Sequence, residues 1–134
     1  MTLKDEERKE LIKLYMDNAR EALHAAGYNK ERFSKIAVDR AYYSMFYAAH
    51  SSLLAEGIKP KTHEGVNNLF SDAFVKTGKF PKEIFKTMGT LENKSYKAEY
   101  DPKTKFPLQE VEKYIKQAEI FVDTVEKMMG DHND

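Results

Sequence analysis

The chain has 134 residues, 41% of them hydrophobic, which is enough apolar material for the core of one domain. Lysine plus arginine and aspartate plus glutamate each number 22, so the net charge excludes a global attraction to nucleic acid or to an acidic membrane. The absence of cysteine excludes a disulfide framework, a thiolate nucleophile and a thiolate-bound metal. The polar first ten residues and the lack of an apolar run of about 20 residues predict a soluble, cytoplasmic protein without a membrane span.

Apolar residues at helical spacing predict two long helices in the first half of the chain. Thr2 is suited to cap the first of them, and we expect this helix to end at Gly27. Aromatic and aliphatic residues then recur over residues 30–56 without a proline or glycine to interrupt them. Gly57 predicts the end of this second helix.

The same spacing predicts three further helices in the second half of the chain, over residues 63–76, 81–100 and 111–130. Thr62 is suited to cap the first of these, and Pro81 to open the second. Gly89 falls inside the second, where glycine costs about 1 kcal/mol relative to alanine. The third carries the longest apolar stripe of the chain and is expected to end near Gly130.

The chain contains no long run of alternating polar and apolar residues and no two-residue hairpin signal between β-branched segments. The predicted linkers are short, which favours antiparallel neighbours around one core. The sequence therefore predicts an all-α fold: one domain over residues 1–134, built as an up-and-down antiparallel bundle of four to five helices.

The densest feature of the sequence is the segment 40–50, RAYYSMFYAAH, in which small and aromatic residues occupy most sides of the expected helix. Such a helix is usually central, with tyrosine rings in the core and their hydroxyl groups at its edge. The alternative is that some of these rings contact a ligand.

Segment 40–50 resembles the central helix of small prokaryotic HEPN-domain proteins. The segments THEGV at 62–66, FVKTG at 74–78 and AEYD at 98–101 resemble the pattern of the same family in the same order, and the resemblance extends from about residue 17 to 121. It implies an up-and-down bundle, often a homodimer and often encoded with a small nucleotidyltransferase. It also implies a role in toxin–antitoxin or RNA-directed defence systems.

Many members of the family are metal-independent ribonucleases, whose signature is an arginine followed four to six residues later by a histidine. In this chain the corresponding region, residues 94–100, holds lysines and tyrosines but neither arginine nor histidine. Lysine lacks the bidentate fork of arginine, and a tyrosine with a pKa of about 10 is a poor base at neutral pH. We therefore expect a binding role. The alternative is a divergent ribonuclease, for which Lys94, Lys97 and Tyr100 are the candidate catalytic residues.

Two histidines are candidate partners for a phosphate group. Arg40 and His50 lie ten residues apart, which is about 15 Å along a helix, so both cannot contact one phosphate within a subunit. His63 follows the predicted cap Thr62, where free amide groups favour an anion. The alternative for His63 is an ordinary surface histidine.

A metal centre is not expected. Helical bundles that hold two metal ions use a pair of Glu-x-x-His motifs, and this chain has one such motif, at Glu21 and His24. No cofactor is predicted.

Lysines are concentrated in the second half of the chain and alternate with aromatic residues, a pattern suited to phosphate contact and base stacking. A solvated lysine-rich face is the alternative. The candidate residues for binding a nucleotide or RNA are Arg40, Tyr43, His63, Lys94, Tyr96, Lys97 and Tyr100. The expected partners are RNA or a nucleotide, a nucleotidyltransferase and a second copy of the chain.

The remaining alternative is a purely structural dimerisation module. Its interface would be the apolar stripe at 111–129.

Overall fold

The computed structural model describes the backbone of residues 3–133 and the side chains of residues 4–130. The described residues form the helices α1 (Leu3–Asn29), α2 (Ser34–Ala55), α3 (His63–Phe70), η1 (Ser71–Val75), α4 (Lys82–Tyr100) and α5 (Leu108–Asn133). No strand occurs in this part of the chain, so the all-α prediction is confirmed. The described helices include no apolar segment of the length that a membrane span requires.

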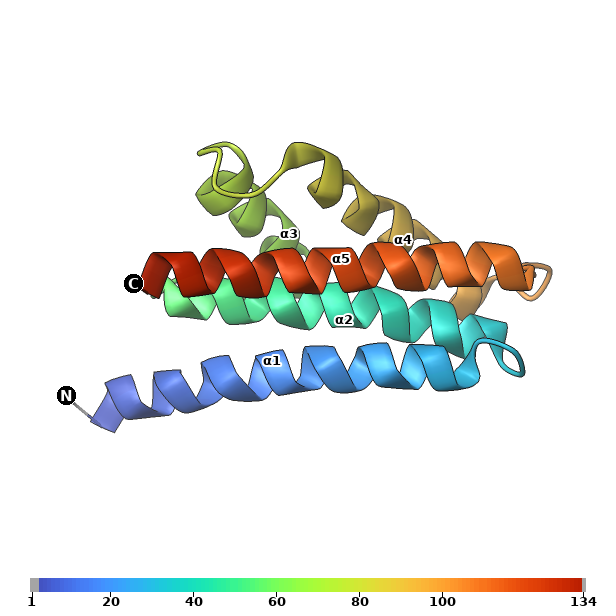
Figure 1. Ribbon diagram of the computed structural model, residues 1–134, viewed down its shortest axis with the longest axis horizontal. Helices are drawn as coiled ribbons and strands as arrows, with labels where there is room; N and C mark the ends of the chain where they lie inside the picture. The colour runs from blue at the N-terminus through green and yellow to red at the C-terminus, as the bar shows by residue number, and fades with distance from the viewer. Residues whose placement is uncertain (1–2, 134) are drawn as a thin grey trace.

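Helices α2 and α5 lie side by side and run in one direction, whereas α1 and α4 run in the opposite direction (Figure 1). This is the up-and-down arrangement that the short linkers predict. In the view of Figure 1, α1 lies below α2, and the pair α3 and α4 lies above. Helix α2 contacts each of the other four α-helices, so it is central, as predicted from segment 40–50.

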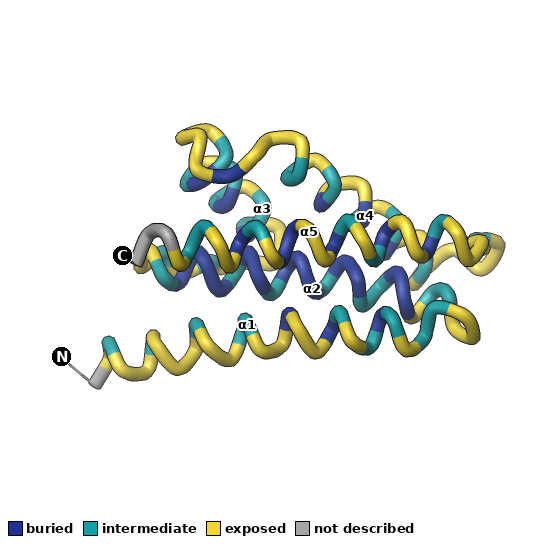
Figure 2. Tube along the Cα trace, in the orientation of Figure 1, coloured by how far each residue is buried: buried dark blue, intermediate teal, exposed yellow. Residues whose placement is uncertain are grey.

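The sequence of α2 explains this position. Alanines at positions 37, 41, 48 and 49 are fully buried, and their small side chains let neighbouring helices approach closely. Figure 2 shows α2 as the most continuously buried helix, whereas α1 is exposed along most of its length. The larger side chains of the core form an aromatic cluster beside α2, which includes Phe70, Phe80 and Phe121.

The helix boundaries confirm some of the predicted signals and contradict others. Thr62 caps α3, with its Oγ1 accepting a hydrogen bond from the Gly65 amide at 2.9 Å. The chain turns at Gly57, two residues after the end of α2, where φ is 77°. The prediction that the first helix ends at Gly27 is wrong, because α1 continues through it to Asn29, whereas α5 ends at Asn133, three residues after Gly130. The predicted cap Thr2 lies outside the described residues.

The predicted third helix over 63–76 is two elements. It is α-helical to Phe70 and then widens into the π-helix η1, in which the Lys76 amide donates to the Ser71 carbonyl at 2.9 Å. The chain then turns at Gly78, whose φ is 80°. Pro81 precedes α4 as its N-cap residue, and Asp101 follows as its C-cap residue.

Candidate functional site

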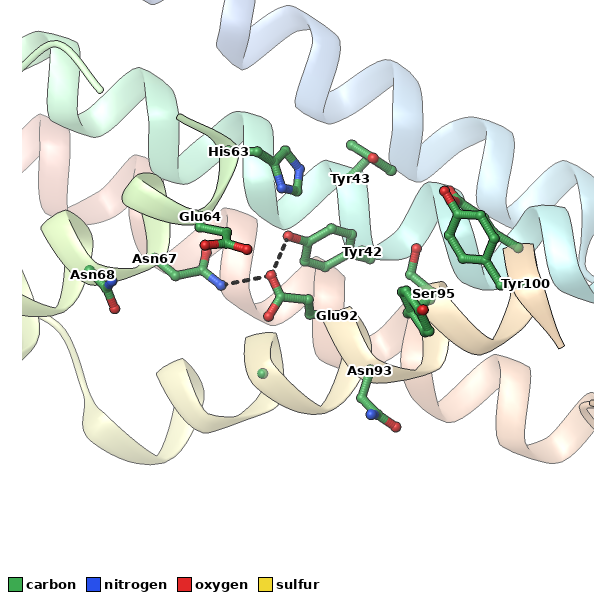
Figure 3. A pocket seen from close by; sticks show the side chains of 13 residues that line it. Tyr42, Tyr43, His63, Glu64, Asn67, Asn68, Glu92, Asn93, Ser95 and Tyr100 are labelled. Atoms are coloured by element: carbon green, nitrogen blue, oxygen red, sulfur yellow. Dashed lines mark hydrogen bonds between the residues drawn. The ribbon is translucent and has the colours of Figure 1, made fainter. Parts of the chain in front are cut away.

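A cavity of about 750 Å³ lies among α2, α3 and α4 (Figure 3), and we call it the main cavity. Its volume falls within the range of about 300–1,000 Å³ that is usual for small-molecule sites. Aromatic, amide and carboxylate side chains dominate its lining, which comprises Tyr42, Tyr43, His63, Glu64, Asn67, Asn68, Gly89, Glu92, Asn93, Ser95, Tyr96, Glu99 and Tyr100.

A hydrogen-bond network joins the three helices at one wall of the main cavity. Oε2 of Glu92 accepts a hydrogen bond from the Tyr42 hydroxyl group and another from Nδ2 of Asn67, each at 3.1 Å (Figure 3). Burial, together with the neighbouring carboxylate of Glu92, raises the pKa of Tyr42, so its hydroxyl group stays protonated and donates. Oδ1 of Asn67 is buried and has no hydrogen-bond partner among the described residues, so it can accept one from a ligand.

A second group of charged side chains lies where α2 faces the C-terminal half of α4. The Ser95 hydroxyl group donates to Oδ1 of Asp39 at 2.5 Å, and Nη2 of Arg40 lies 3.3 Å from Oδ2 of Asp39. The guanidinium carbon of Arg40 lies 5.0 Å from the centre of the Tyr43 ring, within cation–π range. A hydrogen bond to Asp39 raises the pKa of Glu99, because two neighbouring carboxyl groups favour holding a shared proton.

Tyr96 and Tyr100 form an exposed aromatic pair at the rim of the main cavity. They are 63% and 67% exposed, and their ring centres lie 4.9 Å apart on successive turns of α4. Tyrosine rings this exposed leave apolar surface in contact with water, and planar rings can stack on them.

His63, the first residue of α3, is exposed but held in a defined position. Its ring stacks on that of Phe46 with 4.1 Å between centres and an angle of 23° between planes. The rings of Tyr42 and Tyr43 also lie near it, at 6.1 and 5.8 Å. The free amide groups at the start of a helix favour anions at this position.

A smaller cavity of about 290 Å³ lies on the other side of His63, and we call it the second cavity. It is lined by Tyr15, Phe46, Tyr47, His50, Pro60, Lys61, Thr62, His63 and Val66. The His50 ring stacks on Tyr15 with 4.0 Å between centres, and Nδ1 of His50 is buried with no hydrogen-bond partner among the described residues. Burial lowers the pKa of His50, so this imidazole is neutral at physiological pH.

The structure brings together most of the residues that the sequence singled out. Tyr43, His63, Tyr96 and Tyr100 all line the main cavity, and Arg40 adjoins it through its contact with the Tyr43 ring.

The lysines are placed differently. Lys94 and Lys97 are not among the lining residues of the main cavity. At about 100° per residue, they project from α4 on a different side from Glu92 and Tyr96. Of the candidate catalytic residues, Tyr100 alone lines the main cavity, and the roles assigned to all three remain predictions.

Sequence reasoning missed the carboxylate and amide side chains of the site. Glu92, Tyr96 and Glu99 are spaced so that they share one side of a helix, next to the buried side that carries Leu91 and Ser95. That spacing is a readable signal for a polar helix face that borders a cavity. The pair Asn67 and Asn68 on the short helix α3 had no comparable signal.

The geometry defines what the main cavity can bind. Its tyrosines can stack on a planar ring, while its amides and carboxylates offer hydrogen bonds to polar ring edges and hydroxyl groups. The carboxylates of Glu64, Glu92 and Glu99 disfavour an anionic group deep inside. No group of three His, Cys, Asp or Glu side chains suited to a metal ion occurs among the described residues.

Comparison with known proteins identifies relatives over nearly the whole chain. The family model described as "HEPN domain" matches residues 12–128. The chain is 35% identical over 127 residues to a UPF0332 protein of Thermotoga maritima, covering 93% of this chain and 96% of that protein. It is 34% identical over 128 residues to a Methanocaldococcus jannaschii protein named "Putative toxin", covering 94% and 86%, and 37% identical over 128 residues to a second protein of that name and organism, covering 90% of each. The chain therefore belongs to the HEPN-domain family.

Proposed function

We propose that this chain is a toxin-type HEPN module that binds single-stranded RNA through the main cavity. The observation that carries the proposal is the exposed pair Tyr96 and Tyr100 at the rim of a cavity lined by amides and carboxylates. The toxin type is supported by the two Methanocaldococcus jannaschii relatives that are named "Putative toxin".

Base stacking supplies the binding energy in this proposal. An aromatic side chain that stacks on a base of a single strand contributes about 1–3 kcal/mol, whatever the base. Tyr96 and Tyr100 are exposed enough to offer such a surface, and the adjoining cavity is large enough for the base and its sugar.

The carboxylates and amides favour RNA over DNA. The 2′-hydroxyl group of ribose donates and accepts hydrogen bonds, and it distinguishes the two nucleic acids. Glu92 and Glu99 supply acceptors for this group, and Asn67 supplies the buried, unpartnered Oδ1. The phosphates stay outside, where Arg40 provides positive charge beside the Tyr43 ring.

Binding of a short, labelled single-stranded RNA, measured by fluorescence anisotropy, tests the proposal. The double variant Tyr96→Ala, Tyr100→Ala is expected to lose at least about tenfold in affinity, because two stacking surfaces are removed. Tyr28→Ala is the matched control, since Tyr28 is 85% exposed on α1 and does not line the main cavity. DNA of the same sequence should bind more weakly than RNA. Equal binding by the double variant and the wild type would contradict the proposal.

The same RNA, incubated with protein in the presence of a chelator and then resolved on a gel, separates binding from cleavage. Intact RNA with wild-type protein supports a binding module. Cleavage that is lost in the double variant Lys94→Ala, Lys97→Ala would replace the proposal with the divergent ribonuclease predicted as its alternative.

The predicted partners remain part of this proposal. A homodimer is checked by light scattering during size-exclusion chromatography, at concentrations in the micromolar range. Association with a nucleotidyltransferase is checked by co-purification of the two proteins after co-expression.

A further inference from the structure

His63 lies between two cavities. It is the one side chain that lines both the main cavity and the second cavity among the residues described. Its ring is held against Phe46 by stacking, with 4.1 Å between ring centres, so its position between the cavities is fixed by the core.

The two cavities differ in charge. The main cavity contains the carboxylates of Glu64, Glu92 and Glu99. The second cavity is lined by Lys61, by aromatic rings and by His50, and neither aspartate nor glutamate is among its lining residues. An anionic group is therefore favoured next to His63 on the side of the second cavity, and it is disfavoured in the main cavity.

We propose that the protein reads two consecutive nucleotides of a bound RNA strand, with one base in the main cavity, the next base in the second cavity and His63 between them. The connecting phosphate lies against Lys61 and the start of α3. This inference rests on the proposed function, because it names the part of the RNA that the site engages.

The start of α3 suits the connecting phosphate. Thr62 Oγ1 satisfies the Gly65 amide, and the preceding amides of the first turn have no acceptor within the helix. Together with the ammonium group of Lys61 and the imidazole of His63, which both line the second cavity, these amides form a site for one anion.

The second cavity suits one base. Its volume of about 290 Å³ is just below the range for small-molecule sites, about 300–1,000 Å³, so it has room for a single aromatic ring system but not for a larger ligand. Tyr15 and Tyr47 supply ring surfaces there, with 6.3 Å between their centres. The buried, unpartnered Nδ1 of His50 can form a hydrogen bond with the edge of a base.

The test compares a nucleoside 3′-(methyl phosphate) with a dinucleoside monophosphate by competition against the labelled RNA. Both compounds carry one phosphodiester with a single negative charge, so the difference in affinity reports the second nucleoside. The dinucleoside monophosphate is expected to bind at least about tenfold more tightly, because a second base is stacked. Equal affinities would overturn the inference.

Three variants locate the effect. Lys61→Ala is expected to lower the affinity for both compounds severalfold, because it removes the cation beside the phosphate. Lys59→Ala is the matched control, since Lys59 is an exposed lysine of the same connector and lines neither cavity. His50→Phe keeps the stacked ring but removes Nδ1, so it should weaken the dinucleoside monophosphate alone, by about fivefold.

The failure of this inference differs from the failure of the proposed function. RNA binding that depends on Tyr96 and Tyr100 but not on Lys61 or His50 would overturn the two-nucleotide site and leave the main cavity as the binding site. Absence of RNA binding by the wild-type protein would overturn both.

Discussion

Glu92 joins three helices through one oxygen atom. Its Oε2 accepts hydrogen bonds from Tyr42 on α2 and from Asn67 on α3, while Glu92 itself belongs to α4. Tyr42 is only 2% exposed, so its hydroxyl group depends on this acceptor. The network therefore stabilises the fold and fixes one wall of the main cavity.

The variant Glu92→Ala is expected to destabilise the protein by about 1–3 kcal/mol, because it leaves a buried tyrosine hydroxyl group without an acceptor. Urea denaturation followed by circular dichroism measures this. Tyr42→Phe in the Glu92→Ala background removes the stranded hydroxyl group and should recover part of the loss. Equal stabilities of Glu92→Ala and the wild type would show that the network contributes nothing.

Two adjacent tyrosines show the limit of sequence reasoning at this scale. Tyr42 and Tyr43 are the same residue type, and helical spacing indicates only that their side chains point in directions about 100° apart. The sequence placed Tyr43 in the site, and Tyr43 does line the main cavity. The packing of α4 against α2 decided that Tyr42 would line it as well and would hold Glu92.

Glycines show what a helix boundary requires. A glycine ends a helix where the backbone adopts a positive φ, which other residues avoid. Gly57 and Gly78 adopt such angles, 77° and 80°, in the turns that follow α2 and η1. Gly27 and Gly130 do not adopt positive φ and are absorbed into α1 and α5, since the cost of glycine within a helix is only about 1 kcal/mol.

Two alanine substitutions are expected to act in opposite directions. Gly89→Ala should stabilise the protein by about 0.5–1 kcal/mol, because Gly89 lies inside α4 and a Cβ atom there would meet nothing within 4 Å. Gly78→Ala should destabilise it by about 1–2 kcal/mol, because φ at this position is 80°. Thermal melts of the two variants check both signs, and a stabilising Gly78→Ala would contradict the argument.

The whole molecule is held together at the junction of α3, η1, α4 and α5. Phe70 is fully buried, and the centre of its ring lies within 6 Å of the ring centres of Phe74, Phe80, Phe85 and Phe121. This cluster fixes α3 and α4 relative to α5, so the main cavity depends on it for its shape.

Phe70→Ala is expected to cost about 3–5 kcal/mol, because a buried aromatic ring is removed from a packed cluster. Phe33→Ala is the matched control: Phe33 is 54% exposed and should change the free energy of unfolding by no more than about 0.5 kcal/mol. Chemical denaturation of both variants provides the comparison. Similar losses in the two would contradict a core centred on Phe70.

Six features of the molecule could be predicted from the sequence, because spacing, composition and local backbone preference carry them: the family, the all-α class, the central position of segment 40–50, the cap at Thr62 and the turns at Gly57 and Gly78. Which side chains meet could not be predicted, because it depends on how the helices pack. Tyr42 and Asn67 lie 50 and 25 residues from Glu92 in the sequence, and their contact depends on the packing of three helices. The same packing turned Lys94 and Lys97 away from the main cavity and set His63 between two cavities, since the direction of each side chain follows from the rotation of its helix within the bundle.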